Sequence, residues 1–157
     1  MSATEKLFKF LQSKIGAEIH VGPWLMIDQK RIDRFAKVTG DDQWIHTDPE
    51  KAKKESPYGS TIAHGFLTLS LLPYLTESNH PDFFHKNYPG MRMRVNYGLN
   101  RVRFPAPVVV NSRIRARTVL KDAEKDGNAV QIIYIITVEN EKGEKPACIA
   151  EFIVRVY

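Results

Sequence analysis

The sequence predicts an α+β protein in which an antiparallel sheet wraps around one long buried helix, about Ile62–Leu75. This segment is apolar on nearly every side, so other elements must surround the helix that it forms. After Gly90 the apolar residues recur at every second position, which is typical of strands with one buried face. A helix and strands of these kinds both bury their apolar surface if the sheet encloses the helix.

Before the buried helix, the chain is expected to form helices and one strand. Apolar residues at helical spacing predict a helix over Thr4–Ile15, and Glu18–Ile27 has the composition of a strand. Asp28 is suited to cap a second helix, which should run to Thr39 and end at Gly40.

A further helix start follows the polar loop after Gly40. Either Thr47 caps it with Glu50 as its reciprocal partner, or Asp48 caps it with Pro49 at the first helical position. The sequence leaves both alternatives open. A short helix through Lys54 should follow in either case.

The second half of the chain is predicted to form the sheet. Residues 77–90 hold two prolines and are expected to be a loop with one helical turn at most. A slip in the alternation beside Gly98 and Asn100 predicts a β-bulge. The apolar faces of the four expected strands are Met91, Met93, Val95, Tyr97 and Leu99; Ile114, Ala116, Thr118 and Leu120; Val130, Ile132, Tyr134, Ile136 and Val138; and Cys148, Ala150, Phe152, Val154 and Val156.

The length of 157 residues predicts a single domain, with residues 1–16 as an N-terminal helical extension. Cys148 is the single cysteine, so the chain has no internal disulfide and is suited to a reducing compartment, which we expect to be the cytoplasm. Its apolar neighbours indicate a buried strand thiol rather than a nucleophile. Neither a signal peptide nor an apolar run of membrane-spanning length is present, so we expect no membrane partner.

The net charge of +5 is compatible with nucleic acid, anionic lipid or a phosphorylated small molecule. The basic residues are scattered, and the clustered aromatic residues that stack on bases are missing, so we expect no nucleic-acid partner. The strand arginines could form a solvated face, or a few of them could bind ligand phosphates together with the lysines near residue 50. These basic residues are Arg92, Arg94, Arg101, Arg103, Arg113, Arg115, Arg117, Lys51, Lys53 and Lys54.

The polar loop carries the main chemical signal, because it places the carboxylate of Asp41 five residues before the imidazole of His46. In a loop, Asp and His can simply form a turn and a polar surface. As a pair, they could hold one water molecule and exchange its protons near neutral pH.

His64 and Gly65 stand at the start of the expected buried helix. Glycine permits close approach of the backbone, and free N–H groups at a helix start can form an oxyanion hole. The alternatives are tight packing for Gly65 and a hydrogen-bonded structural role for His64. No Cys or paired carboxylate completes a metal site with His80 and His85, so we expect no metal. The sequence also has no glycine-rich phosphate loop, so we expect no nucleotide cofactor.

Three segments together resemble the MaoC-like hydratase family, most closely its nodulation protein N-like branch. They are Thr39–Glu50, Tyr58–Phe66 and Asn96–Pro107, and the resemblance spans roughly residues 20 to 157. The chain departs from the family's pattern in the residues before the histidine, which bear on the shape of the pocket and so on the acyl chain that it accepts. Many members of the wider family have Asn-Pro-Leu before the histidine, where this chain has Gln43-Trp44-Ile45.

The resemblance implies a hotdog fold, a homodimer and (R)-specific hydration of trans-2-enoyl-CoA without a cofactor. It assigns the catalytic pair to Asp41 and His46, and the oxyanion donor to the N–H group of Gly65. Within and beside the matching motifs, the residues that we expect to bind substrate are Trp44, Ala63, His64, Asn96, Arg101 and Arg103.

Two other functions remain open on the same fold, an acyl-CoA thioesterase and a non-catalytic module that binds acyl-CoA or lipid. The homodimer also has a physical reason. One helix would leave part of the sheet and its edges uncovered, and a second copy would cover them.

Overall fold

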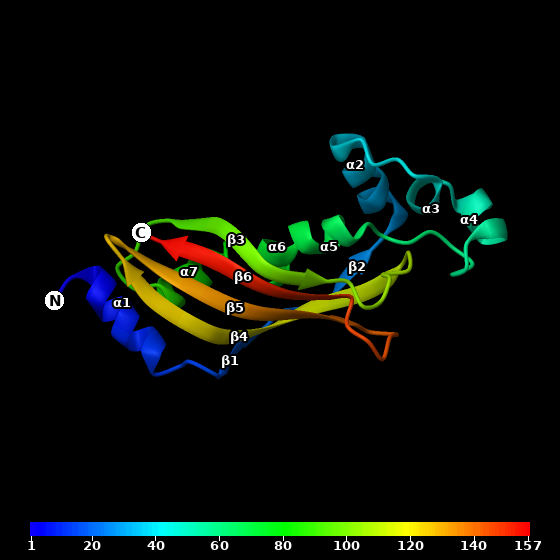
Figure 1. The fold of residues 1–157 in the computed structure, drawn as a ribbon. Helices are drawn as coiled ribbons and strands as arrows, with labels where there is room; N and C mark the ends of the chain where they lie inside the picture. Colours follow the sequence, from blue (N-terminus) through cyan, green and yellow to red (C-terminus); the bar gives the residue numbers. More distant parts are fainter.

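The computed structural model describes residues 1–157 and contains one antiparallel sheet with the strand order β1-β4-β5-β6-β3. The sixth strand, β2, also pairs with β4. The expected α+β architecture, with the sheet packed around central helices, is confirmed (Figure 1). The strands are β1 (Glu18–Val21), β2 (Leu25–Ile27), β3 (Arg94–Arg103), β4 (Ser112–Asp126), β5 (Ala129–Asn140) and β6 (Cys148–Val156).

The helices lie at the two ends of the sheet and along its middle. In Figure 1, α1 and α7 lie at one end, α2, α3 and α4 lie at the other, and α5 and α6 lie between them. They are α1 (Ala3–Gln12), α2 (Gln29–Thr39), α3 (Trp44–Thr47), α4 (Pro49–Glu55), α5 (Gly65–Ser70), α6 (Leu72–Leu75) and α7 (Pro81–Asn87).

The expected caps around the polar loop are present. Asp28 accepts a hydrogen bond from the backbone N–H of Arg31 at the start of α2, and Gly40 ends α2 with a φ of 78°. That left-handed conformation favours glycine and turns the chain into the loop. At α4 the alternative with Asp48 as cap is correct, because its side chain accepts from Lys51 N–H and Pro49 begins the helix.

The prediction of one continuous helix over Ile62–Leu75 is wrong in two respects. The helix begins only at Gly65, and it is interrupted at Leu71, which separates α5 from α6. Residues 62–64 stay extended because their backbone groups bind neighbouring segments. The N–H of Ile62 donates to the carbonyl oxygen of Ile45 (3.1 Å), and that of Ala63 donates to the oxygen of Val108 (2.8 Å).

The predicted faces of β4, β5 and β6 are confirmed, because their alternate residues are buried in one core. Cys148 belongs to this core as a buried free thiol, and its burial raises its pKa to about 11. That excludes the thiolate near neutral pH and confirms the structural interpretation. Leu7 and Leu11 of α1 join the same core. None of the helices combines the length and the apolar character that crossing a membrane requires.

The predicted bulge in β3 is confirmed, but the single apolar face is wrong. The pairing of β3 with β6 shifts between Asn96 and Gly98 and again between Leu99 and Arg101. Val95 therefore pairs opposite Arg155 on the outer face, whereas Leu99 pairs opposite Phe152 on the core face. As an edge strand, β3 tolerates such bulges more easily than a central strand would.

Two further boundaries differ from the predictions. The strand expected over Glu18–Ile27 is divided into β1 and β2, because the chain passes very close to the helical layer at Gly22. A Cβ atom on Gly22 would lie 1.9 Å from the carbonyl oxygen of Leu75. The expected loop over residues 77–90 contains the two-turn helix α7, with Pro81 in its first turn, where proline is tolerated.

Candidate active site

The polar loop and the start of α5 lie against each other, although they are about twenty residues apart in the chain. Asp41 follows Gly40, the C-cap residue of α2, and His46 lies on the one-turn helix α3. His64 is the N-cap residue of α5. One ligand-type atom from each of Asp41, His46 and His64 lies within 4.8 Å of the other two. The structure thus brings the predicted acid and base together beside Gly65.

His46 is held through one ring nitrogen. Its Nδ1 lies 2.7 Å from the carbonyl oxygen of Ile62. Since a carbonyl oxygen only accepts, Nδ1 carries the proton in this contact and Nε2 keeps a free lone pair in the neutral ring. The backbone of Ile62 therefore selects the tautomer in which Nε2 is the basic nitrogen.

The half-buried side-chain amide of Gln29 fixes the backbone around His46. The Nε2 group of Gln29 donates to the carbonyl oxygen of His46 (2.7 Å) and to the Asp33 carboxylate (2.8 Å). Its Oε1 accepts from the hydroxyl of Thr61 at 2.5 Å. The side chain of Gln29 thereby joins α2, α3 and the segment that leads into α5.

Gly65 lies under the ring of Phe104. A Cβ atom added to Gly65 would meet Cδ2 of Phe104 at 2.8 Å, so any other residue would collide with this ring. As the first residue of α5, Gly65 has an N–H group without an acceptor inside the helix. The glycine is therefore explained by tight packing, and its position is also compatible with an oxyanion donor.

Gly65 and His46 line one pocket of about 290 Å³. Its opposite wall is the segment from Phe104 to Val108, in which two prolines restrict the backbone. The pocket is largely apolar, with few polar groups, as small-molecule sites commonly are. Its lining residues are His46, Tyr58, Ile62, Ala63, Gly65, Thr68, Phe104, Pro105, Ala106, Pro107, Val108 and Ala147.

The electrostatics favour a neutral His46. Burial lowers its pKa, and His64 beside it acts in the same direction. The hydrogen bond to Ile62 and the charge of Asp41 oppose this shift without cancelling it. An imidazole with a lowered pKa is unprotonated at neutral pH, so its Nε2 is able to accept a proton.

Asp41, His46 and His64 also have the donor types of a transition-metal site. The two imidazoles are stacked, with ring centroids 3.9 Å apart and an angle of 26° between the planes. A metal ion normally lies in the plane of each imidazole that binds it, and two nearly parallel rings share no such point at bonding distance. The arrangement thus suits proton exchange better than metal binding.

The other residues that we expected to bind substrate differ in where they lie relative to the pocket. Ala63 lines the pocket, whereas His64 is only 2% exposed and has no surface for a ligand. Trp44 is half-buried on α3, and the Nζ of Lys51 lies 4.9 Å from the centre of its ring. Asn96, Arg101 and Arg103 are exposed on β3 and lie outside the pocket lining.

Sequence reasoning did not identify Ile62, Gln29 or Phe104 as site residues. Ile62 acts through its backbone oxygen, which no side-chain pattern reveals. Phe104 lies inside a motif that the resemblance covers, Asn96–Pro107, and this motif was the available signal. Its role became visible only when the fold placed its ring on Gly65.

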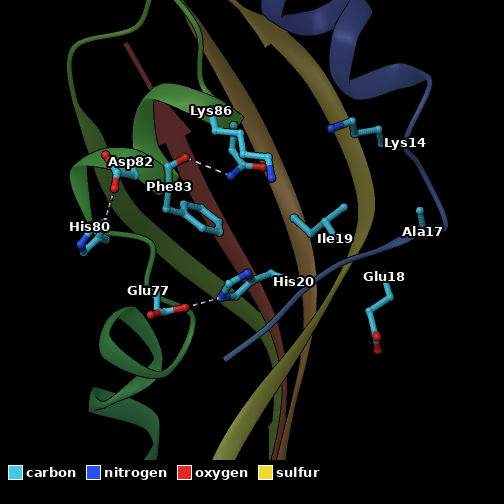
Figure 2. A pocket seen from close by; sticks show the side chains of 11 residues that line it. Lys14, Ala17, Glu18, Ile19, His20, Glu77, His80, Asp82, Phe83 and Lys86 are labelled. Carbon is cyan, nitrogen blue, oxygen red and sulfur yellow. Dashed lines mark hydrogen bonds and ion pairs between the residues drawn. The ribbon is translucent and has the colours of Figure 1, made fainter. Parts of the chain in front are cut away.

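A larger cavity lies at the opposite end of the molecule, between α7 and the segment that connects α1 to β1. It measures about 530 Å³. Figure 2 shows the His20 and Glu77 side chains pointing toward each other in the wall of this cavity, with Phe83 beside the imidazole. The His20 and Glu77 side chains form an ion pair of 2.9 Å.

Residues 10–142 match the MaoC like domain family. The chain is 48% identical over 148 residues to 3-hydroxyacyl-thioester dehydratase Z of Mycobacterium tuberculosis H37Rv, with 92% of each chain covered. It is also 45% identical over 142 residues to nodulation protein N of Rhizobium leguminosarum bv. viciae, which covers 90% of this chain and 85% of that protein.

The fold agrees with a solved structure described as the monoamine oxidase regulatory protein of Archaeoglobus fulgius. The TM-score is 0.74 at 28% sequence identity, and the alignment covers 90% of this chain and 89% of the other. The hotdog fold that the resemblance implied is thereby confirmed. From the sequence match, the relatives and this fold, the chain belongs to the MaoC-like domain family.

Proposed function

We propose that the protein catalyses the reversible (R)-specific addition of water to trans-2-enoyl-CoA, which gives (R)-3-hydroxyacyl-CoA. The observation that carries the proposal is that His46 and Gly65 line one pocket, while a carboxylate oxygen of Asp41 lies within 4.8 Å of a ring nitrogen of His46. The similarity to a 3-hydroxyacyl-thioester dehydratase at 48% identity supports the same reaction class.

In this reaction His46 and Asp41 hold one water molecule. The free Nε2 of His46 accepts a proton from the water as its oxygen bonds to C3 of the enoyl thioester. The carboxylate of Asp41 accepts the second hydrogen bond and orients the water. The pair then returns one proton to C2, so the elements of one water molecule are added across the double bond. No cofactor is required.

Negative charge develops on the thioester oxygen while C3 is attacked. The N–H group of Gly65, at the start of α5, is the donor that we assign to this oxygen. Loss of one such donor costs roughly 3 kcal/mol of transition-state stabilisation in other enzymes. The apolar wall from Phe104 to Val108 would line the acyl chain and exclude water from it.

The decisive assay adds the protein to crotonyl-CoA and to longer trans-2-enoyl-CoA thioesters. Hydration removes the conjugated double bond, so the ultraviolet absorbance of the enoyl thioester should fall. Chiral analysis of the product should show the (R)-3-hydroxyacyl thioester. Absence of turnover at every chain length would refute the proposal.

Two alternatives give different results in the same assay. A thioesterase would release free coenzyme A, which a thiol reagent detects. A non-catalytic binding module would bind acyl-CoA saturably and leave both the double bond and the thioester intact. Neither has a specific geometric observation in its favour, whereas Nε2 of His46 is available as the base for water addition.

We also propose that the protein is a homodimer. Its exposed large apolar side chains include Phe66 on α5 and Tyr74 on α6, which are 66% and 59% exposed. Others follow the edge strand β3 and the residues beside it, namely Met93, Val95, Tyr97, Leu99 and Phe104. A second copy against this surface would cover the open sheet edge. Light scattering on the purified protein should give twice the chain mass of 18.0 kDa.

The reducing cytoplasm is the compartment that we propose for this reaction. A single buried thiol, Cys148, is compatible with that setting, since it forms no disulfide within the chain.

A further inference from the structure

His64 is the one side chain at the site that contacts the other catalytic parts without access to a ligand. Its ring is 2% exposed. Its Nε2 lies 2.8 Å from the backbone oxygen of Asp41 and therefore donates a proton to it. Its ring stacks on His46 at a centroid distance of 3.9 Å and contacts Phe35 at 4.9 Å.

The segment from Ile62 to Gly65 touches each part of the proposed machinery in turn. The carbonyl oxygen of Ile62 holds His46, the imidazole of His64 holds Asp41, and the N–H of Gly65 is the proposed oxyanion donor. Two residues of the extended stretch thus hold His46 and Asp41, and the first residue of α5 supplies the proposed oxyanion donor. The same segment is anchored by the backbone bonds of Ile62 and Ala63 to Ile45 and Val108.

The remaining nitrogen of His64 sets this residue apart from an ordinary structural histidine. Its Nδ1 is buried and has no hydrogen-bond partner. An apolar aromatic residue would fill the same space without this cost, because buried polar atoms without partners are destabilising. A buried acceptor that is retained at a loss of stability indicates that the donor on the opposite nitrogen has a function.

We propose that His64 is a positioning residue, whose Nε2–H holds the backbone of Asp41 and whose ring supports the plane of His46. This inference rests on the proposed hydratase function. It assigns His64 no contact with substrate, in contrast to the substrate-binding role expected from the sequence. Asp41 is exposed and follows a helix end, and apart from the bond to His64 its backbone has one long hydrogen bond, from its N–H to the hydroxyl of Thr39 at 3.4 Å.

Two variants separate the hydrogen bond from the ring. His64→Phe keeps an aromatic ring for the stack and removes the donor. His64→Gln loses the ring, but its amide nitrogen reaches the place of Nε2 and can still donate to Asp41. We expect His64→Phe to lower kcat about 100-fold, the size of effect that a small misplacement of reacting groups can cause, with KM little changed. His64→Gln should recover most of that loss.

The pH dependence of kcat/KM gives a readout that a purely structural role would not move. His64 is one of the groups that hold the pKa of His46 low. In His64→Gln the acid limb of the profile should therefore move to higher pH. Circular dichroism and thermal unfolding check that both variants are folded.

Nitrogen NMR on histidine-labelled wild-type protein tests the assignment without any activity. We expect His64 to carry its proton on Nε2 and His46 to carry its proton on Nδ1. A protonated Nδ1 on His64 would overturn the proposal. So would wild-type kcat in His64→Phe, or equal losses in both variants with KM raised in parallel. If the wild type hydrated no enoyl thioester, the proposed function would fail, while the NMR result would still decide whether His64 holds Asp41.

Discussion

The two ends of the molecule each hold a cavity, and they differ in what their polar groups do. The cavity near α7 is the larger, at about 530 Å³ against about 290 Å³ beside Gly65. The imidazole of His20 there is paired with the Glu77 carboxylate, and Glu18 pairs with Arg117, which lies outside the lining. At the smaller cavity, backbone carbonyls hold two imidazoles so that His46 keeps a free nitrogen. This difference in the available polar groups, and not cavity size, is why we propose that the reaction takes place at the smaller cavity.

The largest expected effect comes from removing the acid and the base at the small cavity. Asp41→Asn and His46→Gln should each lower kcat by about 10²–10⁴-fold, since a positioned proton acceptor contributes that much in other enzymes. The initial rate of crotonyl-CoA hydration measures the loss. Asp42→Asn is the matched control, because Asp42 is a neighbouring exposed carboxylate without a side-chain contact in the structure, and it should keep full activity. Full activity in Asp41→Asn would remove Asp41 from the site.

The second-largest loss of hydration activity is expected from disturbing the contact between Gly65 and Phe104. Gly65→Ala should reduce hydration by about 10-fold or more, because the added methyl group pushes the ring of Phe104 and shifts the start of α5. The double variant Gly65→Ala with Phe104→Ala should be as active as Phe104→Ala alone, since the collision is then absent. If the second substitution rescued nothing, the loss would not come from this contact. The four rates form a double-mutant cycle that isolates it.

Stability away from the site should depend on Gly22. Gly22→Ala forces a methyl group onto the carbonyl oxygen of Leu75 and should cost about 1–3 kcal/mol in the free energy of unfolding. Gly98→Ala is the control, because a Cβ atom there meets nothing within 4 Å. Urea unfolding of both variants measures the difference. Equal stability of the two would contradict the close approach of β1 and β2 to α6.

Acidification should weaken the fold through His46. Burial lowers the pKa of His46 in the folded protein, so below about pH 6.5 the unfolded chain binds a proton that the folded chain does not. The stability contributed by the neutral ring is therefore present above that pH and is lost as the pH falls. Thermal unfolding of wild type should decline more than that of His46→Gln between about pH 8 and pH 5. Parallel declines would argue against the lowered pKa.

The smallest effect is expected at the large cavity. Glu77→Gln removes the charge that pairs with His20, and a partly exposed pair of this kind contributes about 0–1 kcal/mol. Hydration activity should be unchanged. A marked loss of kcat in this variant would mean that the cavity near α7 takes part in the reaction.

Helices and strands that follow from neighbouring residues alone could be predicted from the sequence. The faces of β4, β5 and β6 follow from strict alternation, and the ends of α2 follow from Asp28 and Gly40. The start of α5 was missed because apolar character at residues 62–64 does not show that their backbone binds Ile45 and Val108.

The candidate site was predictable in part. The spacing of Asp41 and His46 and the glycine at 65 were visible in the sequence, and the fold brings them together. The tautomer of His46 depends on its bond to Ile62, and Asp41 is held by a bond from His64. Both bonds join segments about twenty residues apart. Such contacts depend on how the polar loop packs on the start of α5, and no local pattern encodes that packing.

An NMR titration with butanoyl-CoA compares the two ends most directly. This saturated thioester lacks the double bond, so it should bind without being hydrated. We expect shifts of the Gly65 amide and the His46 ring, while the His20 ring stays unchanged. Shifts at His20 with an unchanged Gly65 amide would place the thioester in the large cavity and refute the site at Gly65.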